Sequence, residues 1–330
     1  MAARRKALSA ASAAVTAGLL ALAGSLAPAA AQDYPSKPIR LIVPWSPGGG
    51  TDVLARLIAA KLSEGLKQQV IVENKAGAAS MIGMAALANA AADGYTLALA
   101  TSNLASNPYL YAQHPFDVQR DLAPVVLVSK GVYAMAVHPA VPAQTVGELI
   151  TLVRANPDKY NAAMIGAGAP PHLALTQFMS MTGAKVVGIN YKGAGPAMAA
   201  TVAGETHLMF SSYATMQAMV EAGRLRALAV TSARRTSAAP NIPTASESGL
   251  PGFVFDEWYA IFAPAKTPRA VVDRINAEVR KVLELPDVRE RMRSLASEPS
   301  AGSPEALGEF LKSEMTRFQK LITENNIKAE

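Results

Sequence analysis

The sequence predicts an α/β protein built from two lobes, each with a mainly parallel sheet covered by helices on both faces. Three observations support this prediction. Short apolar runs typical of strands alternate along the chain with amphipathic segments typical of helices. The alternation begins near Ile39 and begins again near Asn161. Both beginnings have the same order of elements, a strand followed by a glycine-rich loop and a helix.

In the first half of the chain, the apolar run IRLIVPW is expected to form the first strand. A helix with its apolar residues on one face follows over residues 51–66, with Thr51 as its N-cap, and another begins at Met81. Lys130 and Gly131 are expected to separate two extended runs. The predicted strands cover residues 39–45, 69–73, 96–101, 125–128 and 133–137.

The second half repeats the alternation and ends in helices. Gly183 and Gly204 are each expected to end a helix, because glycine tolerates the left-handed conformation of a C-cap. Thr267 and Ser303 each place a hydroxyl before a proline, which predicts the starts of two C-terminal amphipathic helices. The predicted strands cover residues 161–165, 185–190, 207–210, 225–230 and 258–262.

Residues 1–31 are typical of an export signal rather than of a folded domain. Three basic residues at 4–6 precede an uncharged stretch rich in Ala and Leu, and the segment ends at 29–31 in the small-x-small pattern that signal peptidase cleaves. Cleavage there makes Gln32 the new N-terminus. A retained membrane anchor is the alternative, although Ala, Ser and Gly partition weakly into lipid. Both the Sec and the twin-arginine routes stay open.

Composition excludes several classes of protein. Half of the 330 residues are hydrophobic and 17% are charged, which excludes a disordered chain and a coiled coil. Without cysteine, the chain has no disulfide, thiolate nucleophile or cysteine-bound metal, and its four histidines are far apart in the sequence. Removing the export signal halves the formal charge of +6, and in the remaining chain no basic run exceeds two residues, so we expect no nucleic-acid partner. We expect a soluble protein outside the cytoplasm.

Two glycine-rich loops are the strongest candidates for a ligand site. Gly48, Gly49 and Gly50 precede one helix, and Gly166 and Gly168 precede another. A helix N-terminus leaves backbone N–H groups unpaired and carries partial positive charge, so each loop can hold an anion without a charged side chain. In open α/β sheets the ligand lies beyond the carboxyl ends of the strands, where both loops fall. The alternative is that both are ordinary tight turns.

Motifs of other functions are absent or incomplete. The first loop imitates a dinucleotide fingerprint, but Val53 occupies the third glycine position, and Pro44 and Pro47 crowd the turn. The chain has neither the G-x-S-x-G nor the G-x-x-x-x-G-K-[ST] motif. Two residues remain open: His172 either contacts a ligand or makes a local hydrogen bond, and Trp45 either forms a wall of the cleft or simply packs.

Several segments resemble one family of receptors in order and spacing. They are YPSKPIRLIVPWSPGGGTDVLARLIAAKL, VIVENKAGAASMIG, DGYTLALATSN, VGINYKGAGPAM, GRLRALAVTS, PTASESGLPGF and WYAIFAPAKTP. They are similar to the periplasmic receptors of tripartite tricarboxylate transporters, the Bug or TctC family, from about Tyr34 to the C-terminal helix. The resemblance implies a type II periplasmic-binding-protein fold, in which two α/β lobes joined by two crossing segments close over a ligand. It also implies a receptor without cofactor or metal, and no enzyme.

The resemblance divides the chain into lobe 1 at 32–132 and 252–330 and lobe 2 at 133–251. It implies that the two loops hold a carboxylate of the ligand, largely through backbone groups, with neighbouring residues lining the cleft. The residues expected to bind ligand are Ser46, Gly48, Gly49, Gly50, Thr51, Asp52, Thr101, Ser102, Gly166, Ala167, Gly168, Ala169, His172, Tyr191, Lys192 and Ser211.

The chain departs from the family pattern in two places. The second loop often carries hydroxyl residues, where this chain has Ala167, Ala169 and Pro170. The strand ending THLMF is commonly followed by an aspartate, where this chain has Ser211 and Ser212. Because the missing carboxylate would accept a hydrogen bond from an amine, we expect a ligand without an amine.

The expected function is the capture of a small organic carboxylate in the periplasm by a monomeric receptor. The expected partner is the membrane permease of a tripartite tricarboxylate transporter. One alternative is a sensory receptor that docks on the ectodomain of a histidine kinase. An exported hydrolase is a more remote alternative.

Overall fold

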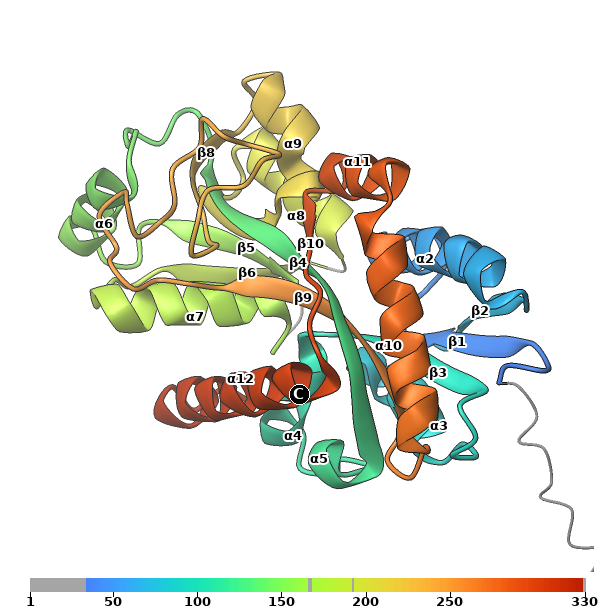
Figure 1. Ribbon diagram of the computed structural model, residues 1–330. Coiled ribbons are helices and arrows are strands. Elements are labelled where there is room, and N and C mark those ends of the chain that lie inside the picture. The colour runs from blue at the N-terminus through green and yellow to red at the C-terminus, as the bar shows by residue number, and fades with distance from the viewer. Residues whose placement is uncertain (1–33, 166–167, 192, 329–330) are drawn as a thin grey trace, which may run out of the picture. The chain divides into compact units, whose positions relative to one another are not determined.

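The computed structural model describes residues 34–165, 168–191 and 193–328 (Figure 1). The predicted export signal at 1–31 lies outside the described residues. The chain divides into a short unit, Met1–Lys37, and a compact unit, Pro38–Glu330, which contains the helices and strands described below. Within the described part of the chain, no helix combines the length and the apolar character needed to span a bilayer.

The first sheet starts with three parallel strands, β1 (Ile39–Val43), β2 (Val70–Asn74) and β3 (Thr96–Thr101). The apolar residues of β1 and β3 are buried on both faces, as parallel strands between two helical layers require. Helices α2 (Gly50–Leu66) and α3 (Met81–Ala88) follow β1 and β2, so the alternation predicted from the sequence is confirmed here. A single 3₁₀ turn, η1 (Ala78–Ser80), precedes α3.

The second sheet contains the parallel strands β5 (Asn161–Ile165), β6 (Val187–Tyr191) and β7 (Leu208–Ser212). Their helices are α7 (Pro170–Thr182), α8 (Ala194–Ala203) and α9 (Tyr213–Glu221), while α6 (Val146–Ala155) precedes β5. Gly183 and Gly204 are the left-handed C-caps of α7 and α8, as the sequence predicts. Strand β8 (Arg226–Val230) follows α9 and runs antiparallel to β4 (Leu122–Val137).

Strand β4 belongs to both sheets. As far as Val132 it pairs with β9 (Asp256–Pro264), which in turn pairs with β3, and from Tyr133 onwards it pairs with β7. The sequence predicts a break at Lys130 and Gly131, and this prediction is wrong. Both residues pair with β9, so 122–137 forms one continuous strand, while β10 (Ser297–Pro299) joins its other edge.

The C-terminal region returns to the first sheet as three helices, α10 (Arg269–Glu284), α11 (Pro286–Ser294) and α12 (Pro304–Glu324). Ser303 caps α12 through the N–H of Ala306 (3.2 Å), as predicted. Thr267 does not cap α10, which begins one residue later than expected. Helix α10 packs on α2 and β4, and α12 packs on β4, on α7 and on the short helix α4 (Asn103–Leu110), near α5 (Val118–Asp121) (Figure 1).

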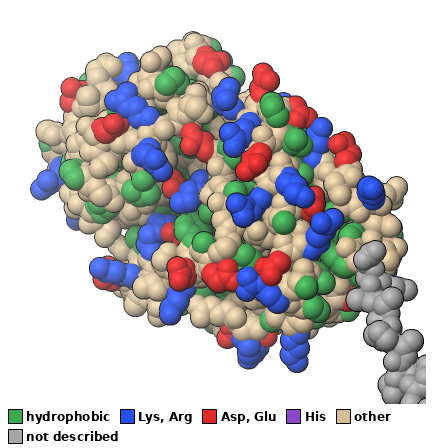
Figure 2. Space-filling model, viewed as in Figure 1, with side chains coloured by type: hydrophobic (Ala, Val, Ile, Leu, Met, Phe, Trp, Pro, Cys, Tyr) green, Lys and Arg blue, Asp and Glu red, His purple; other side chains and the backbone are tan. Residues whose placement is uncertain are grey.

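One large apolar core connects the two sheets. It includes Trp258 of β9, Phe210 of β7 and Phe318 of α12, all fully buried. The indole Nε1 of Trp258 donates a hydrogen bond to Glu314 of α12 (3.1 Å), so its polar edge is satisfied within the core. Figure 2 shows basic and acidic side chains interspersed over one face of the molecule.

Candidate functional site

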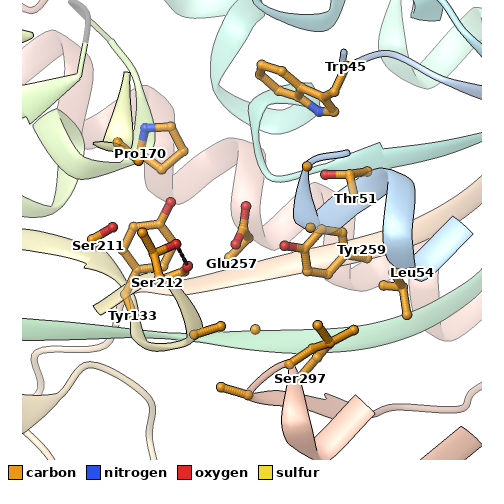
Figure 3. Close-up of a pocket in the computed structure, with 18 of the residues that line it drawn as sticks. Trp45, Thr51, Leu54, Tyr133, Pro170, Ser211, Ser212, Glu257, Tyr259 and Ser297 are labelled. Carbon is orange, nitrogen blue, oxygen red and sulfur yellow. Dashed lines mark hydrogen bonds between the residues drawn. The ribbon is translucent and has the colours of Figure 1, made fainter. Parts of the chain in front are cut away.

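A cavity of about 800 Å³ lies between the two sheets, and β4 and β9 form one of its sides (Figure 3). Its walls come from the loop after β1, the start of α7, the ends of β5 and β7, and the segment before β10. The lining residues are Trp45, Ser46, Pro47, Gly48, Gly49, Gly50, Thr51, Leu54, Asn103, Gly131, Val132, Tyr133, Ile165, Ala169, Pro170, Pro171, Ala194, Ser211, Ser212, Ala214, Thr215, Glu257, Tyr259, Leu295, Ala296 and Ser297.

The first glycine loop brings the N-terminus of α2 to this cavity. Gly49 is the N-cap, and its carbonyl accepts the first helical hydrogen bond from the N–H of Val53 (3.0 Å). The prediction that Thr51 is the N-cap is therefore wrong by two residues. Gly48 has a φ of +83°, a conformation that glycine adopts at low cost. No side chain caps the helix, so its first N–H groups are left for a ligand or water.

Asp52 supports this loop from behind and is not among the lining residues. Its side chain is buried and accepts hydrogen bonds from the backbone N–H of Gly48 (2.9 Å), from Nε of Arg56 (3.0 Å) and from Nδ2 of Asn74 (2.9 Å). The hydrogen bond from Arg56 is the main reason why the pKa of Asp52 falls to about 2; those from Gly48 and Asn74 add to it. Asn74 also donates to the carbonyl of Trp45 (3.0 Å), so one small network holds both ends of the loop.

The second glycine loop brings the N-terminus of α7 to the opposite wall. Gly168 has a φ of +74°, and its N–H donates to Nδ1 of His172 (2.9 Å). His172 thus makes a local hydrogen bond and does not line the cavity, and burial lowers its pKa. Ala169 is the N-cap of α7 and lines the cavity. Gly166 and Ala167 lie outside the described residues.

The other predicted residues divide between the cavity and its surroundings. Ser211 lines the cavity at the end of β7. Thr101 lies behind the wall, where its Oγ1 accepts a hydrogen bond from Nε1 of Trp45 (3.3 Å), so Trp45 both lines the cavity and makes a structural contact. Ser102 is buried beside it, and Tyr191 packs against an apolar cluster of the second sheet. Neither of these two is among the lining residues, and Lys192 lies outside the described part of the chain.

Among the lining residues that were not predicted from the sequence, three carry titratable groups: Tyr133 of β4, and Glu257 and Tyr259 of β9. Figure 3 shows the carboxyl of Glu257 in the middle of the cavity between the two tyrosines. Burial raises the pKa of Glu257 to about 6, and the hydroxyl of Tyr259 offsets this rise only in part. Burial, and then the nearby Glu257, also raises the pKa of both tyrosines.

A signal for Glu257 was present in the sequence. Successive side chains of a strand point to opposite faces, so a fully buried Trp258 directs Glu257 and Tyr259 to the other face. Of the two acidic residues that precede the apolar run WYAIFAP, Asp256 and Glu257, only Glu257 falls on this other face, which indicates that the face lines a polar space. Among the described residues, no group of three or more His, Asp or Glu side chains could hold a metal ion.

Known proteins match the chain over most of its length. The family model described as "Tripartite tricarboxylate transporter family receptor" matches residues 54–327. The UPF0065 protein of the tcbD-tcbE intergenic region of Pseudomonas sp. (strain P51) is 37% identical over 297 residues, which is 90% of this chain and 88% of that protein.

Solved structures show the same arrangement. Rpa4515 of R. palustris with adipate has a TM-score of 0.80 and 31% identity, covering 90% of this chain and 99% of that one. The periplasmic binding protein BugD has a TM-score of 0.76 and 32% identity, covering 90% of this chain and 100% of that one. MatC from Rhodopseudomonas palustris with bound malate has a TM-score of 0.74 and 27% identity, covering 88% of this chain and 100% of that one.

Proposed function

Because the chain belongs to the receptor family of the tripartite tricarboxylate transporters, we propose that it binds a small organic carboxylate in the periplasm and delivers it to such a transporter's permease. Members of this family and the similar structures are substrate-binding receptors rather than enzymes. Two of the similar structures hold a dicarboxylate, adipate in one and malate in the other. These ligands support a carboxylate as the class of solute.

The observation that carries this proposal is that the N-termini of α2 and α7 line one cavity. Each helix start has partial positive charge, which favours an anion between them. The two starts contribute differently. Pro170 and Pro171 have no N–H, so α7 offers its dipole but few donors, whereas α2 begins at Gly49 and Gly50 with its N–H groups uncapped. The carboxylate therefore binds at the start of α2.

The remaining lining residues complete the site. Ser46 and Thr51 lie beside the α2 start, and Ser211 faces them from β7 in the other sheet, so hydroxyls of both lobes reach the same ligand. The proposed site also includes residues 166–167 and Lys192. In the sequence, 166–167 directly follow β5 and Lys192 directly follows β6.

Closure of the two lobes, 32–132 with 252–330 and 133–251, is part of the proposed mechanism. Strand β4 runs from the first lobe into the second, and the chain crosses back near Pro251, so rotation occurs within β4 near Tyr133 and in the segment near Pro251. Affinity then depends on contacts made in the closed state, because a ligand favours a conformation only through differential binding.

A thermal-shift screen tests the proposal on protein expressed from the full-length gene and purified from the periplasm. Mass spectrometry of that protein locates the N-terminus expected at Gln32. A carboxylate at a hundred times its dissociation constant stabilises the fold by about 2.7 kcal/mol, which is several degrees. Substituting Gly50 by Leu fills the α2 start and should abolish the shift, whereas Gly302→Leu, outside the cavity, should retain it. A panel of aliphatic, hydroxy, aromatic and amino carboxylates that gives no shift on ligand-free protein contradicts the proposal.

A further inference from the structure

The cavity has an acidic side that the anion-binding loops do not explain. Glu257 is the one charged side chain among the described residues that line it. The other described lining residues are apolar or neutral, and they include three aromatic side chains, Trp45, Tyr133 and Tyr259. A carboxyl group in such a place is costly unless a partner compensates it, because burial penalises an unpaired charge.

The strands around Glu257 supply no cation to the cavity. On β9, the neighbouring Asp256 is also acidic and does not line the cavity. On β4, Lys130 lies one residue from Gly131 on the alternate face, where its Nζ lies over the ring of Phe310, 4.8 Å from the centroid. Arg56, behind the first loop, is engaged by Asp52. The hydroxyl of Tyr259 is thus the main polar group that favours the ionised form of Glu257.

The anion-binding loop and the glutamate lie on either side of the same tyrosine. A Cβ placed on Gly50 at the start of α2 would be 4.0 Å from the hydroxyl of Tyr259. That hydroxyl also faces Glu257 (Figure 3). A small ligand with its carboxylate at α2 therefore reaches Glu257 with its other end.

We propose that Glu257 selects a ligand that carries an ammonium group at the end opposite its carboxylate. This inference rests on the proposed carboxylate-binding function and names the ligand class, an amino carboxylate. The ammonium donates hydrogen bonds to Glu257 and neutralises its charge, and the rings of Tyr133 and Tyr259 beside it favour a cation through their π-electrons. The second carboxylate of a dicarboxylate would instead meet a negative group.

This proposal replaces the expectation of a ligand without an amine. That expectation depended on Ser211 and Ser212 standing where relatives have an aspartate. The structure shows that the cavity nevertheless contains a carboxyl group, which comes from β9 instead of the end of β7. At neutral pH a carboxyl group with a pKa of about 6 is mostly ionised, which suits an ammonium partner.

Two matched pairs of probes test the proposal by calorimetric titration of ligand-free protein. They are 4-aminobutyrate with succinate, and 6-aminohexanoate with adipate; each pair has the same carbon count and differs in its end group. At pH 7.5 we expect at least one amino carboxylate to bind tenfold or more tightly than its dicarboxylate partner. In Glu257→Gln that amino carboxylate should lose at least tenfold in affinity while the dicarboxylate gains.

The variant Asp256→Asn is the matched control, because it removes the same charge one residue away and outside the cavity. It should leave the preference unchanged. Tighter binding of both dicarboxylates by the wild type, or equal preference in wild type and Glu257→Gln, overturns the amine selection while leaving carboxylate capture intact. Binding of none of the four probes counts against the proposal, and the wider thermal-shift panel then decides separately on carboxylate capture.

Discussion

Glu257 of β9 lies directly opposite Gly131 of β4 in the antiparallel strand pair, and both residues line the cavity. A Cβ on Gly131 would be 3.5 Å from Oε2 of Glu257 and 3.3 Å from Cε2 of Tyr259. The second distance is tighter than most real contacts, so the absence of a side chain at Gly131 leaves room for the Tyr259 ring. Glycine usually weakens the interior of a strand, and here the gain is space beside the half-buried carboxyl group of Glu257.

Substituting Gly131 by Ala should weaken ligand binding more than it weakens the fold. The added methyl group pushes the Tyr259 ring by a few tenths of an ångström and occupies the space beside the Glu257 carboxyl. We expect several-fold lower affinity in calorimetry and a change of under about 1 kcal/mol in the free energy of unfolding. Gly302→Ala is the control, because its Cβ meets Ala306 at an ordinary 3.6 Å. Equal affinity in both variants would contradict this account.

Substituting Glu257 by Gln should stabilise the ligand-free protein at high pH. The pKa of Glu257 rises from 4.5 to about 6 on folding, so the folded state binds the proton more tightly than the unfolded state. Stability is therefore full below pH 4.5 and falls as the pH rises through 6, by roughly 2 kcal/mol in total. The Glu257→Gln variant cannot ionise at this position, so its free energy of unfolding does not fall in this way as the pH rises.

Urea unfolding of both proteins at pH 4 and pH 8 measures this effect. The stability of Glu257→Gln relative to wild type should increase by roughly 2 kcal/mol between the two pH values. Asp287→Asn provides a control of opposite sign, because Lys61 lowers the pKa of Asp287 and the carboxylate therefore stabilises the fold above its unfolded pKa. A pH-independent difference for Glu257→Gln would show that its carboxyl is well solvated.

Substituting Asp52 by Ala should destabilise the fold and weaken ligand binding together. The change leaves the N–H of Gly48 without its side-chain acceptor and leaves the amide of Asn74 with the Trp45 carbonyl as its remaining acceptor. Hydrogen bonds to a buried charged group contribute about 1.5–3 kcal/mol, so we expect a loss of that size in urea unfolding. Asp273→Ala removes another Asp–Arg pair four residues apart, with both partners exposed, and should cost under about 0.5 kcal/mol. Similar losses in both variants would refute the bracing role of Asp52.

Alanine at Gly48 should lower the stability of the fold, whereas alanine at Gly50 should lower the affinity for ligand. At Gly48 the added Cβ has open space but φ is +83°, so the variant should lose about 1 kcal/mol of stability. At Gly50 the backbone is helical and the nearest atom is the Tyr259 hydroxyl at 4.0 Å, so stability should hold while the Cβ obstructs the anion position. Thermal unfolding and ligand titration of both variants separate the two effects. A stable Gly48→Ala that binds normally would contradict this reading of the loop.

Much of the fold could be predicted from the sequence because its signals are local. The order of strand, glycine loop and helix at the start of each lobe needs only neighbouring residues to be recognised, and it places Gly48 to Gly50 and Ala169 at helix N-termini. Errors occurred where a boundary depends on detail. Gly49 rather than Thr51 caps α2, since several residues of the loop could begin the helix and the tight turn after Pro47 decides between them.

The acidic side of the cavity could not be assembled from local signals. Antiparallel pairing of β4 and β9, which are more than a hundred residues apart in the sequence, brings Glu257 close to Gly131 and Tyr133. The residues near Glu257 in the sequence do not indicate which residues it will contact. The same pairing explains why Lys130 and Gly131 do not interrupt β4. Their backbone groups find partners on β9, and this tertiary contact outweighs the low strand propensity of glycine.

The place of β9 between β3 and β4 also determines when the first sheet can be completed during synthesis. Until the chain has reached Pro264, β3 and the first part of β4 each lack the strand that will lie between them, although both were made long before. The elements of the second sheet, from α6 to β8, are synthesised after β4 and before β9. A nascent chain that ends before Asp256 therefore presents two unpaired strand edges, which are sites of aggregation. The cavity side formed by Glu257 and Tyr259 is added as those edges are covered, and the wall at Leu295, Ala296 and Ser297 follows later in synthesis.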